Sequence, residues 1–174
     1  MQTIARLRQV YGRFLSLCGL IAGVITFAVM CLVVVNALMR YGLNQPLKGT
    51  LELTEAALPL MIFLSLALTQ FAGGHIKVVL LTQHLAPGGQ RALRVIAMLM
   101  GAGLFGWAAY AGWLMAEKSY RIGELERGSI RFPIWPIKGA VFFGLLILSI
   151  QFLIDAIFCA LGGTLPDEEA EAIE

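Results

Sequence analysis

Four long runs of apolar residues divide this chain, and they constrain its fold more than any other feature. Runs without a charged residue occupy Phe14–Met39, Ala56–Gly74, Val95–Ala116 and Gly139–Ile154. A bilayer core of ~30 Å requires roughly 20 apolar residues in a helix, and a helix satisfies its own backbone hydrogen bonds in lipid. We therefore predict an all-α membrane protein with four transmembrane helices. The expected spans are about 14–39, 54–74, 95–116 and 139–160.

The composition also places most of the chain in lipid. Hydrophobic residues make up 59% of it and charged residues only 14%, whereas ordinary soluble domains carry about a quarter charged residues. We predict one transmembrane domain over residues 1–165 and a solvated acidic tail over 166–174. The net charge of +2 is too small to indicate nucleic-acid binding.

The first 13 residues place apolar side chains at helical spacing with arginines between them. This pattern fits a short amphipathic helix lying at the lipid headgroups, and it fits a plain basic leader equally well. The first apolar run is too long for a signal-peptide core and no small-residue cleavage site follows it, so we expect a retained span. Basic residues flanking that span favour the amino terminus inside by a thin margin, three against two.

The stretch from Arg40 to Leu81 joins the first two runs and carries charges at both of its edges. Glu52 and Glu55 are three residues apart, so they share one face at the start of the second helix. An acid in a first turn is favoured by the helix dipole by roughly 0.3–1 kcal/mol, which explains this pair as well as a functional role does. Arg40 or Lys48 could pair with either glutamate.

The third helix combines small and aromatic residues. Glycines interleave with tryptophan and tyrosine along it, at Gly101, Gly103, Gly106, Trp107, Tyr110, Gly112 and Trp113. This mixture indicates tight helix packing, with an aromatic side toward lipid or a partner. Beyond Ala116 the helical pattern continues, since Glu117–Arg121 and Glu124–Arg127 have the spacing of helical ion pairs. Gly128 is expected to end it.

Several kinds of chemistry are missing from the sequence. No span has an ionisable residue near its centre, where proton and ion pathways usually place one. Asp155 lies near the end of the last run, where the cost of about 2.5–3.5 kcal/mol at a helix centre is much smaller. The cysteines have no pair or metal spacing, and no phosphate-binding loop, catalytic triad or zinc motif occurs. We expect a membrane scaffold or partner subunit that is no enzyme and holds no cofactor.

Short motifs lie at the ends of the predicted spans. Arg40-Tyr41 closes the first span, Glu52 and Glu55 open the second, and His75-Ile76 follows it. A Phe-Pro-Ile-Trp-Pro-Ile-Lys motif, residues 132–138, precedes the last helix, which ends in Leu-Ile-Asp155. In order and spacing these motifs resemble the small membrane subunit of tripartite ATP-independent periplasmic (TRAP) transporters, the DctQ-like family. The resemblance covers roughly residues 13–158.

The resemblance implies two protein partners in the bacterial inner membrane system. One is a large multi-span subunit that holds the sodium and substrate sites, and the other is a periplasmic substrate-binding protein that captures an organic acid. Both termini would lie in the cytoplasm, so the first and third loops would face the periplasm, with Lys48, Arg127 and Arg131 as docking charges. The candidate partner-interface residues are Arg40, Lys48, Glu52, Glu55, His75, Arg127, Arg131 and Trp135.

Two other classes compete with this interpretation. A free-standing tetraspan could transport or conduct as a homo-oligomer, and the Gly19–Gly23 GxxxG motif would serve its packing equally well. The lack of ionisable residues near the span centres speaks against it, although backbone and hydroxyl groups can also line a pore. A membrane enzyme would need a reactive cluster of side chains that the sequence does not contain.

Overall fold

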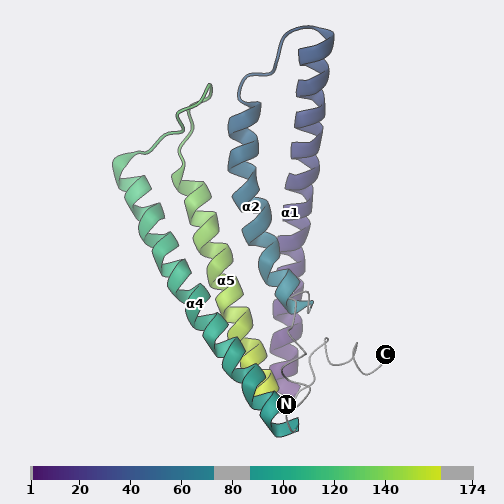
Figure 1. Cartoon of the computed structure of the whole chain (residues 1–174), viewed down its shortest axis with the longest axis vertical. Coiled ribbons are helices and arrows are strands. Elements are labelled where there is room, and N and C mark those ends of the chain that lie inside the picture. Colours follow the sequence, from purple (N-terminus) through teal and green to yellow (C-terminus); the bar gives the residue numbers. More distant parts are fainter. Residues whose placement is uncertain (1, 73–86, 162–174) are drawn as a thin grey trace.

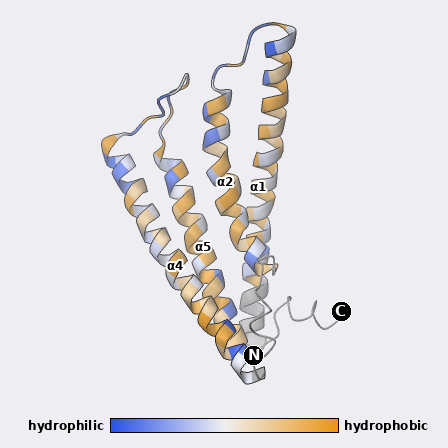
Figure 2. Ribbon diagram, in the orientation of Figure 1, coloured by the Kyte–Doolittle hydropathy of each residue, from blue (hydrophilic) through white to orange (hydrophobic). Residues whose placement is uncertain are grey.

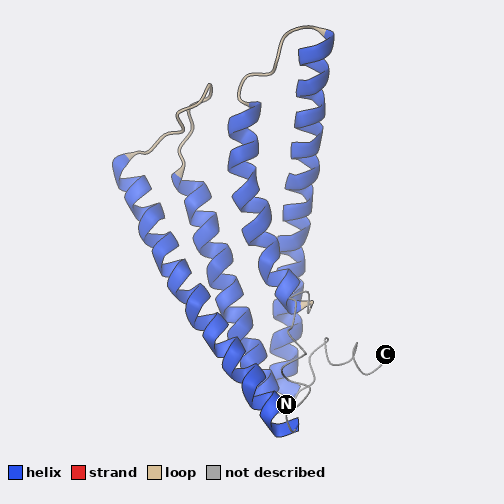
Figure 3. Cartoon of the chain, in the orientation of Figure 1, coloured by secondary structure: helices blue, strands red, loops and turns tan. Residues whose placement is uncertain are grey.

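The computed structural model describes residues 2–72 and 87–161, with side chains from Val10 and Gly88 onward in the two segments. Four helices account for most of these residues: α1 (Gln2–Gly42), α2 (Thr50–Phe71), α4 (Pro87–Ile122) and α5 (Trp135–Ala160) (Figures 1 and 3). All four are long and apolar enough to cross a membrane. The predicted all-α class with four apolar helices is therefore confirmed. Within the described residues, the nearest approach to a strand is an isolated bridge between Leu125 and Pro133.

The helices form an open row instead of a closed bundle. The extensive helix contacts join α4 to α5, α5 to α2, and α2 to α1. The row converges near the amino terminus and spreads toward the opposite end (Figure 1). There the two interhelical connections, residues 43–49 and 123–134, lie at the same end of the molecule. Hydrophilic residues gather toward the helix ends and hydrophobic ones fill the lengths between them (Figure 2).

α5 is the most buried of the four helices, and it packs on both α4 and α2. In the apolar 18-residue stretch of α5, 44% of the residues are buried inside the chain, compared with 11% in the corresponding stretch of α1. One buried cluster joins α1, α2 and α5 through Leu15, Ala67, Ile147 and Leu148. Near the amino-terminal end α1 also reaches α5 directly, because the Tyr11 hydroxyl donates a 2.7 Å hydrogen bond to the Ile147 carbonyl.

Close packing of α2 on α5 depends on Gly144. A Cβ atom at this position would collide with the carbonyl group and side chain of Phe63, so only glycine permits this approach of the two backbones. Only one of the two glycines in the GxxxG motif of α1 lies in a close contact with another described helix. A Cβ at Gly19 would meet Leu68 of α2, whereas at Gly23 it would meet no described atom within 4 Å.

Most helix ends lie outside the predicted spans of about 14–39, 54–74, 95–116 and 139–160, and two ends change the interpretation. α1 begins at Gln2 and continues without a break into the first span, so no separate amino-terminal helix precedes it. α4 ends at Ile122, because Gly123 adopts a φ of 62°, and the predicted end at Gly128 is wrong. A positive φ at a glycine directly after a helix is a common termination geometry.

The early end of α4 also overturns one predicted ion pair. Glu124 and Arg127 lie outside the helix and therefore lack helical spacing, and Glu124 instead binds Lys138 of α5 at 2.5 Å. The predicted Glu117–Arg121 pair is confirmed at 2.5 Å. His75, the segment 78–85 and the predicted acidic tail all lie outside the described residues.

Candidate functional site

The connection between α1 and α2 is folded back onto the helices it joins. The side-chain oxygen of Asn36 accepts a 2.9 Å hydrogen bond from the backbone N–H of Leu47. The Thr50 hydroxyl donates to the Leu47 carbonyl at 3.1 Å. Gly49 has a φ of 86° and lies against Ile130, where a Cβ would collide with that side chain. The connection is thus held both by α1 and by the other interhelical loop.

Glu52 joins the two connections. It lies in the first turn of α2, and only 7% of its surface is exposed. One of its carboxylate oxygens accepts a hydrogen bond from the backbone N–H of Ser129, in the connection between α4 and α5. A Cβ at Gly128 would collide with the same carboxylate, so glycine is required for the approach. Hydrogen bonds to an ionised acceptor are among the stronger ones in proteins, so this contact is a clamp between the two connections.

The connection between α4 and α5 is itself a small hairpin. The Glu126 N–H donates to the Phe132 carbonyl at 2.9 Å, and the Ile134 N–H donates to the Glu124 carbonyl at 3.1 Å. The Lys138 ammonium donates to the Glu124 carboxylate at 2.5 Å and lowers the pKa of that carboxyl below its usual value. The hairpin is therefore anchored to α5 by Lys138 and to α2 by Glu52.

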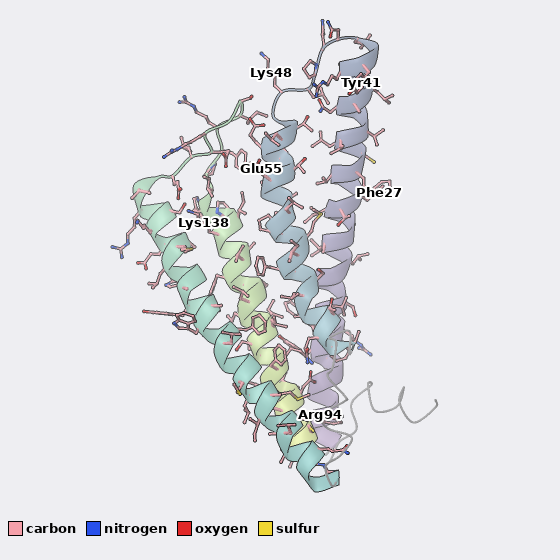
Figure 4. The ribbon with its side chains drawn as sticks, viewed as in Figure 1. Phe27, Tyr41, Lys48, Glu55, Arg94 and Lys138 are labelled. Carbon is pink, nitrogen blue, oxygen red and sulfur yellow. The ribbon has the colours of Figure 1, made fainter. Side chains whose placement is uncertain are left out.

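The positive candidate residues lie around this clamp and are exposed. Arg40, Lys48, Arg127 and Arg131 have exposed side chains, and Figure 4 shows Lys48 projecting from the connection between α1 and α2. Among the described residues, neither Arg40 nor Lys48 forms an ion pair with Glu52 or Glu55. The guanidinium of Arg40 lies 6.0 Å from the ring centre of Tyr41 instead.

The remaining candidates occupy different surroundings. Glu55 is exposed, one turn below the buried Glu52, so the predicted shared face contains one free and one clamped carboxylate. Trp135 begins α5, is 42% exposed and packs edge-on against Tyr120 at 5.4 Å between ring centres. The structure thus brings Lys48, Glu52 and the hairpin together.

A second polar cluster, buried among the helices, was missed by sequence reasoning. Asp155 of α5 is only 2% exposed, and its Oδ2 accepts hydrogen bonds from the side-chain amides of Gln151 at 2.9 Å and Gln70 at 3.4 Å. The prediction placed Asp155 near the end of the last span, and the structure adds that protein encloses it there. The sequence could have indicated this cluster, because Gln151 and Asp155 are four residues apart in an otherwise apolar helix and therefore lie on one face of it.

The two clusters lie at opposite ends of α2. The Glu52 clamp lies at the start of α2, and the Gln70–Gln151–Asp155 cluster lies where α2 ends. Within residues 2–72 and 87–161, no group of three or more histidine, cysteine, aspartate or glutamate side chains could hold a metal ion. The described part of the chain can therefore bind through charge, backbone groups and apolar faces.

One comparison with known proteins gives a match. No curated protein and no solved structure matches the chain significantly. A family model described as "Tripartite ATP-independent periplasmic transporters, DctQ component" matches residues 29–162. That range covers the clamp, the hairpin, α2, α4, α5 and the last third of α1. The chain thus belongs to the DctQ component family of the tripartite ATP-independent periplasmic transporters.

Proposed function

We propose that this chain is the small scaffold subunit of a sodium-coupled, binding-protein-dependent importer of organic acids. It packs against the large transport subunit, which holds the sodium and substrate sites, and it helps to dock the periplasmic substrate-binding protein. Its termini lie in the cytoplasm, and the two connections 43–49 and 123–134 face the periplasm. Substrate chemistry belongs to the partners, so this chain contributes rigidity and surface.

The open row of helices supports a scaffold role. A channel within one tetraspan needs an interior enclosed by several helices, whereas here α4, α5, α2 and α1 follow one another side by side. Such a row has two broad apolar faces and suits packing against a larger membrane protein. Each outer helix, α1 and α4, has a described helix neighbour on one side only, which leaves its other side for lipid or for that partner.

The Glu52 clamp carries the docking part of the proposal. Glu52, at the start of α2, binds the backbone of the hairpin. The two connections therefore form one surface, and a backbone hydrogen bond helps to fix its shape. Lys48, Arg127 and Arg131 stand exposed on that surface, while Lys138 is neutralised by Glu124. A partner with an acidic rim fits such a surface, because complementary charges steer association and set orientation.

Two experiments test the two parts of the proposal, and a pull-down tests the scaffold role. The tagged chain is extracted from its native membrane in mild detergent, and the accompanying proteins are identified by mass spectrometry. A large multi-span protein in near-equal amount is expected, and its absence, or recovery only of further copies of the chain, would overturn the scaffold role in favour of a homo-oligomeric tetraspan.

For docking, Lys48→Glu, Arg127→Glu and Arg131→Glu are each assayed for substrate uptake at several salt concentrations. The matched control is Arg91→Glu, an exposed arginine at the opposite end of the molecule. Uptake should fall in the first three variants, most at low salt where charges are least screened, and it should be unchanged in the control. Equal uptake in all four variants at every salt concentration would contradict the docking role.

A further inference from the structure

One side of α4 is turned away from every other described helix. Its residues recur at alternating intervals of four and three and are all exposed: Ile96, Met100, Gly103, Trp107, Tyr110 and Leu114. We call this set the α4 stripe. The other side of α4 packs on α5 through small residues such as Ala102 and Ala109, which are 4% and 2% exposed. Alternating spacing of this kind is how a helix presents one continuous face to another helix.

The middle of the α4 stripe lies deep in the membrane. The apolar part of α4 is bounded by Arg94 and Glu117, and Figure 4 shows Arg94 toward one end of the row. At about 1.5 Å per residue, Trp107 is about 20 Å along the axis from Arg94 and about 15 Å from Glu117. With a hydrocarbon core of ~30 Å, Trp107 lies near the midplane and Tyr110 about 5 Å farther along the helix.

This depth is unusual for side chains with a polar group. Tryptophan and tyrosine gather at membrane interfaces because their rings are apolar while the N–H and O–H groups require hydrogen bonds. Trp107 is 71% exposed and Tyr110 is 61% exposed. No described residue accepts a hydrogen bond from either side chain. Hydrocarbon offers no acceptor, so lipid covering this face would leave two donors unsatisfied at a cost of about 1–3 kcal/mol each.

The outward face of α1 provides the contrast within the same molecule. Its large exposed side chains are purely apolar along the span: Leu20, Val24, Phe27, Val34 and Leu38. The nearby hydroxyl of Thr26 is satisfied, because it donates to the Ala22 carbonyl at 2.8 Å. Lipid can cover this face of α1 without losing a hydrogen bond. The two outer helices of the row therefore differ in what they require of their surroundings.

A glycine adds a second feature to the α4 stripe. Gly103 lies between Met100 and Trp107 along the stripe, and a Cβ placed on it would meet no described atom within 4 Å. Small residues at such positions allow the backbone of a neighbouring helix to approach closely. Gly23 of α1 is open in the same way, but no unsatisfied donor lies beside it. The open glycine together with two hydrogen-bond donors suits a protein helix.

We propose that the α4 stripe is the surface through which this chain packs against the large membrane subunit of its transporter. Trp107 and Tyr110 donate hydrogen bonds to oxygen atoms on a transmembrane helix of that subunit, and Gly103 receives a side chain from it. The inference rests on the proposed function, since the family implies a tripartite assembly. It adds which helix makes the contact and through which groups.

Photo-crosslinking in the native membrane tests the position of this contact. A photoreactive phenylalanine analogue replaces Trp107 or Tyr110, and, as the matched control, Phe27 of α1. Phe27 is aromatic, 66% exposed and at similar depth, on the other outer helix (Figure 4). Adducts with a large multi-span protein are expected from positions 107 and 110 and not from 27. Adducts from 27 alone, or adducts from 107 and 110 only with lipid or with a second copy, would overturn the proposal.

Substitutions then test the hydrogen bonds themselves. Tyr110→Phe removes one hydroxyl and should lower recovery of the large subunit in a competitive pull-down by about threefold, the scale of one interhelical hydrogen bond. Trp107→Leu should lower it by about tenfold, as expected for a central aromatic anchor. Phe27→Leu should leave recovery of the large subunit unchanged. In all three variants the amount of the chain in the membrane should equal that of the unmodified chain. Unchanged recovery in both Trp107→Leu and Tyr110→Phe would contradict the proposal.

The two levels of inference fail in different ways. If the unmodified chain captures no large subunit, the scaffold function itself is wrong. If it captures the subunit but the crosslinks arise from position 27, the function stands and the α4 stripe is not the contact.

Discussion

The two ends of α2 are held to the rest of the chain by different chemistry. At the end with the connections, Glu52 accepts a hydrogen bond from a backbone N–H of the hairpin. At the other end, Asp155 accepts hydrogen bonds from the side-chain amides of Gln70 and Gln151. Between them the backbones touch at Gly144 and Phe63. The first fastening shapes a loop surface and the second holds helices together, so loss of each should affect a different property.

The difference follows from the surroundings. Water can replace a lost hydrogen bond near the exposed connections, so breaking the Glu52 clamp should loosen the hairpin while the helices stay associated. A polar group left unpaired inside a membrane protein finds few alternative partners. Breaking the Asp155 cluster should therefore weaken the association of α2 with α5.

The largest effect is expected from Asp155→Leu. It leaves the amides of Gln70 and Gln151 without their shared acceptor, and we expect the free energy of unfolding in detergent to fall by about 2–4 kcal/mol. Asp155→Asn, which keeps one oxygen acceptor, should lose less. Reversible denaturation followed by circular dichroism gives both values. Equal stability of Asp155→Leu and the unmodified chain would show that the cluster does not fasten the helices.

A bulkier residue at Gly144 tests the contact between the two fastenings. Gly144→Val places a branched side chain against the backbone of Phe63, and we expect a loss of about 1–3 kcal/mol from the forced separation of α2 and α5. The control is Gly23→Val, since Gly23 faces open space on α1. The same denaturation experiment applies, and equal losses at both glycines would remove close backbone packing as the explanation.

A smaller and more local effect is expected from Glu52→Ala. Removal of the carboxylate releases the N–H of Ser129, so hydrogen exchange at residues 128–130 should accelerate by about tenfold, the equivalent of about 1.4 kcal/mol. Glu52→Gln retains an acceptor oxygen and should show less acceleration, while Glu55→Ala should show none. Exchange that accelerates equally throughout α2 and α5 would mean that the two fastenings do not act separately.

The smallest effect concerns pH at the base of the hairpin. The hydrogen bond from Lys138 lowers the pKa of Glu124 below its ordinary value of 4.5. Because the pKa is lower in the folded chain than in the unfolded one, the pair stabilises the hairpin above pH of about 4.5, and that contribution is lost as the pH falls through the folded-state pKa.

Hydrogen exchange at Glu126 and Ile134, corrected for its intrinsic pH dependence, should therefore increase on acidification. In Glu124→Gln the exchange should be faster at neutral pH and should change little on acidification. An identical pH response in both proteins would exclude Glu124 as its source.

Much of the fold could be predicted because membrane spans depend on local composition. Apolar runs of sufficient length identify helices wherever they pack, and the order of the short motifs at their ends pointed to the family. Helix ends were harder. The end of α4 at Gly123 instead of Gly128 depends on which glycine adopts a positive φ, and this was decided by the hairpin that follows.

The partners of the polar residues could not be predicted for a related reason. Glu52 and Glu55 look equivalent in the sequence, yet one binds the hairpin and the other is exposed, because the hairpin reaches only the first of them. Gln70 and Asp155 are separated by 85 positions and meet only when α2 lies beside α5. Spacing along one helix contains no information about a neighbour so distant in the chain.

The sequence by itself determined that the chain enters a membrane as four helices, and its motifs determined the family. Both depend on residues close together in the chain, where helical geometry and the cost of exposing backbone groups to lipid leave few alternatives. Only the tertiary structure decided the order of the helices in the row, the fastenings at the two ends of α2, and the outward direction of Trp107 and Tyr110. These depend on side-chain contacts between segments far apart in the chain, which local physical chemistry does not specify.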